Sequence, residues 1–177
     1  MSDEGISFPS LILCSFPDSF FFPLEMALSG KLSTEIPIQA PAAKWFDLFA
    51  KQLHHVQNLV ERVHHTKLHH GDDWHHPESV KHWTYVIDGK VVTCKERIES
   101  YDEQNKTITY ILFNGDISQR YKVFKFIFRV IEKEDGSASV NWTVEYEKID
   151  DSVEPPYGYV EYLTKSSKDI DDNLLKA

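Results

Sequence analysis

The chain carries the stretch VKHWTYVIDGKVVTCKERIES at residues 80–100. Two runs rich in β-branched and aromatic residues, 80–87 and 91–100, flank the dipeptide Asp88-Gly89. An Asp-Gly pair between two such runs is a strong hairpin signal, because both residues tolerate the positive φ that a tight turn requires. These residues therefore predict two antiparallel strands joined by a short turn.

The regions on either side of this hairpin predict further strands and helices. Turn residues such as Asn114-Gly115 and Asp135-Gly136 separate the later runs. The additional strands are expected at residues 28–38, 64–70, 106–113, 121–131 and 139–149, and helices at 41–49, 54–60 and 156–175. In the last helix, apolar residues recur at spacings of three and four, which gives it a face that can cover a sheet. The predicted class is α+β, with an antiparallel sheet covered by a long C-terminal helix.

Length and charge narrow the class of protein. The 177 residues fit one domain, and 28 acidic against 19 basic residues give a formal net charge of −9. A general nucleic-acid binder needs a basic stripe, so we expect no nucleic-acid partner. No uncharged apolar stretch reaches about 18 residues, so we also expect no membrane partner. The two cysteines, Cys14 and Cys94, cannot form a disulfide framework, which favours a reducing, cytoplasmic location.

The N-terminal segment, residues 1–25, differs from the rest of the chain. It is rich in Phe, is interrupted by three prolines and contains no Lys or Arg. A secretory signal needs a basic start and an unbroken apolar core, and this segment has neither. We therefore predict a disordered or loosely packed extension at residues 1–25, followed by a single folded domain at residues 26–177.

Several short motifs, taken in order, resemble one protein family. These motifs are Ser29-Gly-Lys-Leu32, Gly71-Asp-Asp-Trp74, Ile87-Asp-Gly-Lys90, Lys95-Glu-Arg-Ile-Glu99, Asn114-Gly-Asp116, Tyr121-Lys122 and Glu145-Tyr-Glu-Lys-Ile149. Through them the chain resembles the plant major latex protein branch of the Bet v I, or pathogenesis-related class ten, superfamily over about residues 27–175. The resemblance implies a helix-grip fold: a seven-stranded antiparallel sheet wrapped around a long C-terminal helix, two short helices closing one end, and a large internal cavity.

The resemblance also implies a function. Members of this branch are cytosolic carriers of hydrophobic plant metabolites linked to defence and stress, and a few relatives are enzymes of alkaloid biosynthesis. The expected partner is thus a hydrophobic small molecule, with no cofactor, and the protein is expected to be a monomer or weak homodimer. The alternative is a cofactor-independent isomerase or condensing enzyme that uses the same cavity. Residues 71–79 contain one glycine and three acids where class ten relatives carry a glycine-rich loop, which disfavours phosphate binding.

Apolar and aromatic side chains share one parity along the predicted strands. They could form either a filled core or the wall of a cavity, and the resemblance favours the wall. The expected ligand-binding residues are Trp83, Tyr85, Cys94, Ile98, Tyr110, Leu112, Phe124, Phe126 and Tyr146 on strands, and Val160, Leu163 and Ser167 on the helix.

One charged residue, Glu96, shares the parity of Cys94 and Ile98. If its carboxylate faces inward, burial raises its pKa and suits it to proton transfer. The competing interpretation is that this parity faces solvent, or that Glu96 pairs with a neighbouring base. Glu96 and His82 are the candidate catalytic residues, while Cys94 has no evident base partner that would activate it.

All nine histidines fall within residues 54–82. Imidazole is a common metal ligand, so a metal site is one hypothesis. The other is a surface that gains positive charge as the pH falls. Because cysteine ligands are absent from this region and the spacing matches no closed zinc motif, we predict no metal.

Overall fold

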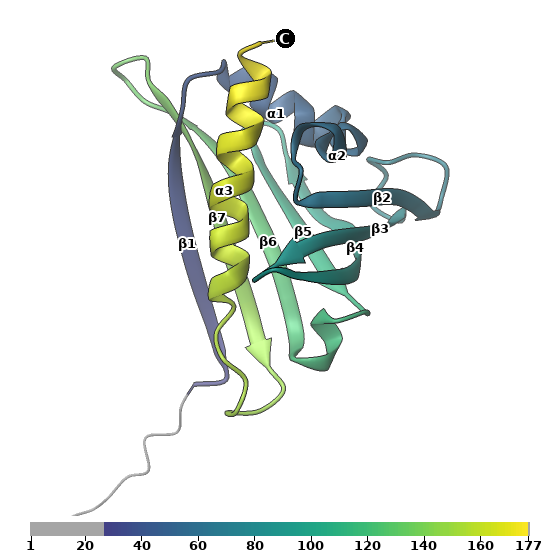
Figure 1. Ribbon diagram of the computed structural model, residues 1–177. Coiled ribbons are helices and arrows are strands. Elements are labelled where there is room, and N and C mark those ends of the chain that lie inside the picture. Colours follow the sequence, from purple (N-terminus) through teal and green to yellow (C-terminus); the bar gives the residue numbers. More distant parts are fainter. Residues whose placement is uncertain (1–26, 177) are drawn as a thin grey trace, which may run out of the picture.

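The computed structural model describes residues 27–176, and it contains one seven-stranded antiparallel sheet in the order β1-β7-β6-β5-β4-β3-β2 (Figure 1). The strands are β1 Ser29–Ile38, β2 Val63–His70, β3 Val80–Ile87, β4 Lys90–Asp102, β5 Thr107–Phe113, β6 Tyr121–Glu132 and β7 Ala138–Lys148. The helices are α1 Ala42–Lys51, α2 Val56–Leu59 and α3 Tyr157–Leu174, with 3-10 turns η1 Leu53–His55 and η2 Ile117–Gln119. The expectation for residues 1–25 lies outside the described residues.

The sheet curves around α3, while α1 and α2 lie at one end of the molecule (Figure 1). Strand β1 pairs with β7, so segments from the two ends of the chain are neighbours, and β2 forms the opposite edge of the sheet. This arrangement confirms the expected α+β class and the helix-grip architecture. Among residues 27–176, no helix combines the length and apolar character that crossing a membrane requires.

The hairpin that the sequence predicts has the expected geometry. Asp88 and Gly89 have φ angles of 51° and 73°, the left-handed values of a tight hairpin turn. This turn sits against the start of α3, where a Cβ added at Gly158 would lie 2.2 Å from Asp88 Oδ2. Glycine at position 158 therefore makes room for the Asp88 carboxylate, which would have to move to accommodate a larger residue.

Aromatic side chains fill the end of the interior next to α1. Trp45 on α1 is fully buried, and the Phe49 and Phe128 rings lie with centroids 4.3 Å apart. The Asp171 carboxylate on α3 ties this end together by accepting hydrogen bonds from the backbone N–H groups of Gln39 and Ala40 and from Trp45 Nε1. These bonds fix the chain entering α1 against the last turns of α3.

Candidate functional site

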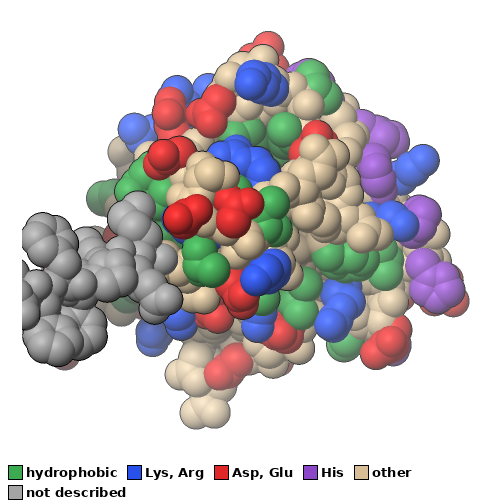
Figure 2. Space-filling view, turned by 90° about the horizontal axis from the view of Figure 1, so that it is seen from below, with side chains coloured by type: hydrophobic (Ala, Val, Ile, Leu, Met, Phe, Trp, Pro, Cys, Tyr) green, Lys and Arg blue, Asp and Glu red, His purple; other side chains and the backbone are tan. Residues whose placement is uncertain are grey.

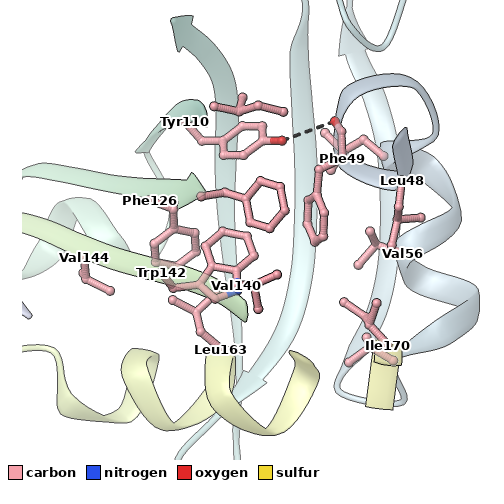
Figure 3. Packing of buried hydrophobic residues seen from close by; sticks show 14 of the residues in the cluster. Leu48, Phe49, Val56, Tyr110, Phe126, Val140, Trp142, Val144, Leu163 and Ile170 are labelled. Carbon is pink, nitrogen blue, oxygen red and sulfur yellow. Dashed lines mark hydrogen bonds between the residues drawn. The ribbon is translucent and has the colours of Figure 1, made fainter. Parts of the chain in front are cut away.

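An internal cavity of about 60 Å³ lies between the sheet, the short helices and α3. Figure 3 shows part of its wall, with Phe126 and Trp142 from the sheet above Leu163 on α3, and Phe49 and Val56 on the helical side. The lining residues are Phe49, Leu53, Val56, Trp83, Tyr85, Glu96, Tyr110, Leu112, Phe126, Trp142, Tyr162, Leu163, Ser166, Ser167 and Ile170.

The cavity is much smaller than the large one that the resemblance implies. A volume of about 60 Å³ holds a few water molecules, whereas pockets for drug-sized ligands span roughly 300–1,000 Å³. Aromatic rings occupy the remaining space: Phe126 and Trp142 meet edge to face at 6.2 Å, and Tyr85 stacks on Tyr162 at 5.2 Å. The interior is thus a mostly filled core with a residual cavity, so both interpretations of the strand aromatics hold in part.

The structure brings most of the expected ligand-binding residues together. Seven of them line the cavity: Trp83, Tyr85, Tyr110, Leu112, Phe126, Leu163 and Ser167. Two of these have fixed polar groups, because Tyr110 Oη donates to the Phe49 carbonyl at 3.3 Å and Trp142 Nε1 donates to Ser167 Oγ at 3.0 Å. The wall is therefore apolar, with its polar atoms concentrated at a few positions.

The other expected residues lie elsewhere. Ile98, Phe124 and Tyr146 are buried in parts of the core that do not border the cavity, and Val160 is only half-buried on α3. Parity along a strand predicts which face a side chain occupies, but the cavity spans only part of that face. Phe124, for example, packs on Tyr121 and Tyr159 near the start of α3.

The carboxylate of Glu96 faces inward and lines the cavity, with its side chain almost completely buried. Burial raises the pKa of Glu96 to about 7. The positive charge of Lys81 opposes this rise, as does the nearby Trp83 indole, although Trp83 Nε1 forms no well-aligned hydrogen bond. The solvent-facing alternative for Glu96 is therefore wrong.

Lys81 lies directly opposite Glu96 on β3 and is fully buried. Its Nζ forms no hydrogen bond in the described part of the chain, and burial lowers its pKa. Glu96 Oε1, Trp83 Nε1 and Ser166 Oγ are also buried without a hydrogen-bond partner among these residues. Native proteins rarely leave such atoms unpaired, so this wall of the cavity is a position where water or a ligand group belongs.

The other catalytic candidate, His82, occupies the opposite face of β3 from Trp83 and does not border the cavity. Cys94, expected to bind ligand, does not border the cavity either. It is buried, with Sγ 3.1 Å from Tyr85 Oη, and burial raises the pKa of its thiol well above the ordinary value. A thiol that stays protonated is a poor nucleophile.

The histidine-rich region does not form a metal centre. Within residues 27–176, no group of three or more His, Cys, Asp or Glu side chains could hold a metal ion. The histidines instead spread over η1, the edge strand β2, the loop that follows it and the outer face of β3.

Several cavity residues, and Lys81 opposite Glu96, were not predicted from the sequence. Lys81 shares the parity of Trp83 and Tyr85, and that signal could have identified it beside Glu96. The others come from elements whose position depends on tertiary packing: Phe49, Leu53, Val56, Trp142, Tyr162, Ser166 and Ile170.

The fold and this site define a class: helix-grip proteins whose curved sheet and long C-terminal helix enclose an apolar cavity. The model of the pathogenesis-related protein Bet v 1 family matches residues 27–177, and the chain belongs to this family.

Individual relatives point to the major latex proteins. MLP-like protein 31 of Arabidopsis thaliana is 40% identical over 151 residues, which cover 84% of this chain and 88% of the relative. MLP-like protein 43 of the same plant is 38% identical over 84% of this chain and 95% of its own length. The crystal structure of major latex-like protein 151 from Panax ginseng is 31% identical, with a TM-score of 0.80, and the match covers 84% of this chain and 99% of that one.

Proposed function

We propose that the protein binds and carries a hydrophobic small plant metabolite in the cavity between the sheet and α3. The observation that carries this proposal is a cavity with an apolar wall in which Trp83, Glu96 and Ser166 present polar atoms unpaired among the described residues. Ligand pockets typically combine an apolar lining with a few placed polar groups. Ligand binding is also what the family is known for.

A metabolite larger than the cavity must displace side chains as it enters. The rings of Tyr162 and Phe126 are the main obstacles, since each fills space beside the cavity. Binding then buries the ligand's apolar surface, which contributes roughly 25 cal/mol per Å² before the cost of ordering is subtracted. We expect slow association, because a conformational change precedes or accompanies entry.

The proposed setting is the cytoplasm, in a defence or stress response, with the protein acting as a monomer or weak homodimer without a cofactor. This part of the proposal rests on membership of the family and on the relatives named as major latex proteins.

Binding of a polarity-sensitive dye tests the carrier function. We expect micromolar affinity, displacement by flat apolar metabolites, and a decrease of at least tenfold in dye affinity in Ser166→Leu, which fills the cavity. Lys168→Leu introduces the same side chain at an exposed position of α3 and should leave affinity unchanged. Absence of dye binding, or equal weakening by both variants, would contradict the proposal.

The second candidate function is a cofactor-independent isomerase or condensing enzyme. The observation that favours it is Glu96, whose pKa of about 7 suits a general acid or base at neutral pH. An enzyme should lose turnover by a factor of about 10² to 10⁴ in Glu96→Gln while it keeps its affinity. A carrier should show no turnover of any bound metabolite, and its affinity should change by less than about tenfold.

A further inference from the structure

The outer face of β2, β3 and β4 carries a row of bases. Lys67, His82 and Lys95 lie directly opposite one another in the register of these three neighbouring strands. We call the following set the basic face: His65, Lys67 and His69 on β2, His82 on β3, and Lys95 and Arg97 on β4.

The charges of the basic face act on one another. Burial lowers the pKa of the His82 imidazole, and the positive charges of Lys67, His69 and His65 from β2 and of Lys95 from β4 lower it further. Lys67, Lys95 and Arg97 form no ion pair with any described residue. The basic face therefore concentrates like charges that have no ion-pair partner among the described residues, and Glu99, two residues beyond Arg97 on β4, is paired with Lys125.

The other half of the outer sheet surface is built differently. Its lysines are matched with carboxylates, in the pairs Lys31–Glu145, Lys122–Glu147, Lys125–Glu99 and Lys133–Glu35. Lys90, Arg129, Lys168 and Lys176 also form no ion pair with a described residue, but none of these four lies opposite another base in the strand register. The clustering of bases on three neighbouring strands therefore distinguishes the basic face.

Apolar side chains accompany these bases. Val80 and Val86 on β3 are half-buried on the same face as His82, and Val91 beside the hairpin turn is 59% exposed. In Figure 2, His side chains (purple) gather along one side of the molecule together with Lys and Arg (blue). A broad surface of cations mixed with small apolar groups suits the headgroup region of a lipid bilayer.

We propose that the basic face docks the protein on an anionic phospholipid membrane, and that docking strengthens as the pH falls toward 6. Three cations are permanent, and each contributes roughly a fivefold gain in affinity near an anionic leaflet. Imidazole takes up a proton as the pH falls, which adds positive charge to the basic face, although the lowered pKa of His82 delays its own protonation to a lower pH. Each histidine that becomes protonated also reduces the formal net charge of −9, which weakens the general repulsion from an anionic membrane.

An anionic membrane fits better than a nucleic acid. A nucleic-acid track needs a long stripe of permanent cations, and here three permanent cations share the surface with two half-buried valines and the exposed Val91. The sequence predicted no membrane partner because it has no apolar stretch long enough to span a bilayer. A protein that docks on the membrane surface does not need such a stretch. The proposal does not depend on the cavity, although a carrier of apolar molecules would exchange them at such a surface.

Co-sedimentation with vesicles tests this surface. Vesicles of phosphatidylcholine and phosphatidylserine, mixed at about seven to three, should bind the full chain at least tenfold more tightly at pH 6.0 than at pH 7.5. Vesicles of phosphatidylcholine alone should not bind it. Lys67→Glu/Lys95→Glu should weaken binding at least tenfold, whereas Lys168→Glu/Lys176→Glu, the same charge change on the α3 side, should not.

A second variant isolates the histidines. His65→Gln/His69→Gln/His82→Gln should show at most about a third of the wild-type pH effect, since only the general charge effect of the other six histidines remains, with its fold verified by circular dichroism. Equal binding to uncharged vesicles, equal loss in both lysine variants, or no binding at pH 6.0 would overturn the proposal. Binding to heparin as tight as binding to anionic vesicles would assign the face to polyanionic polymers and would also overturn it.

Discussion

Two buried carboxylates, Asp171 and Glu96, differ in their surroundings. Asp171 accepts three hydrogen bonds at 2.9–3.0 Å, from two backbone N–H groups and the Trp45 indole. By contrast, Glu96 Oε1 has no hydrogen-bond partner among the described residues. Nζ of Lys81, which lies opposite Glu96 on β3, has none either. Glu96 is 6% exposed and Asp171 is 9% exposed, so burial alone does not distinguish them.

The difference separates a structural polar group from one that is open to function. A fully satisfied buried carboxylate stabilises the fold, because its donors would be unpaired without it. An unsatisfied pair such as Lys81 and Glu96 costs stability, since desolvation of the two charges is not repaid by good geometry. The polar group at Asp171 thus contributes to packing of α1 on α3, whereas the wall at Glu96 retains polar atoms that a ligand could satisfy.

The largest effect is expected for Asp171→Ala. Removal of the carboxylate leaves three buried donors unpaired, and each such donor costs about 1–3 kcal/mol. We expect a loss of about 3 kcal/mol or more in the free energy of unfolding, measured by urea denaturation. Asp172→Ala alters the exposed neighbour on the same helix and should change stability by less than about 0.5 kcal/mol. A similar small effect in Asp171→Ala would remove the contrast with Glu96.

Replacement of Lys81 and Glu96 together by apolar residues should increase the free energy of unfolding, the opposite of the effect of Asp171→Ala. In Lys81→Met/Glu96→Leu both charges give way to apolar side chains of similar volume, which often stabilises a protein by about 1–4 kcal/mol. Lys81→Met alone should destabilise it, because Glu96 then remains buried without a countercharge. Urea denaturation of the three proteins measures both effects. A double variant less stable than the wild type would mean that the pair supports the fold.

The pH dependence of stability should report Glu96 separately. Burial raises the pKa of Glu96 in the folded state to about 7, above its value near 4.5 when unfolded. Folding then takes up a proton, so the stabilisation is fully present below pH 4.5 and is lost as the pH rises through 7. Between pH 5 and 7.5, the difference in stability between wild type and Glu96→Gln should change by on the order of 2 kcal/mol. A difference that is constant with pH would show that Glu96 is ionised throughout.

Local sequence patterns predicted the framework of the fold well. The Asp88-Gly89 turn, the alternation of Val140, Trp142 and Val144, and the spacing of Leu163 and Ile170 are local signals, and each element lies where they placed it. Glu96 was identified as a candidate inward-facing carboxylate because the other residues on its side of the strand, such as Cys94 and Ile98, are apolar. These predictions succeeded because strand and helix periods depend on the chain itself.

The size and outline of the cavity could not be predicted in the same way. Phe49, Val56 and Ser166 border it only because α1, α2 and α3 pack at particular angles against the sheet. Its small volume depends on ring orientations, such as the stacking of Tyr85 on Tyr162, which the sequence does not encode locally. The family resemblance implied a large cavity, but it did not predict that aromatic rings fill most of that space.

The smallest effect concerns the loop between β2 and β3, which closes over the η1 turn near the cavity. His75 Nε2 accepts a hydrogen bond from the Leu53 backbone N–H at 3.4 Å, and the rings of Trp74 and His54 lie 5.6 Å apart. Burial lowers the pKa of His75, Asp73 opposes this, and the charges of Lys81 and His54 add to it. Because only neutral imidazole can accept this bond, the contact is present above about pH 6.5 and is lost as the pH falls below the lowered pKa.

Amide hydrogen exchange, corrected for the intrinsic effect of pH, measures the opening of this loop. One hydrogen bond contributes about 1 kcal/mol, so protection of the Leu53 amide should decrease about fivefold between pH 7.5 and pH 5.5, with α3 unaffected. His75→Gln offers a carbonyl acceptor that does not titrate, and it should abolish the pH dependence. His70→Gln changes an exposed histidine and should preserve it. Loss of protection in the His75→Gln variant at both pH values would mean that the imidazole holds the loop by packing. The hydrogen bond from the Leu53 N–H would then make no measurable contribution to the position of this loop.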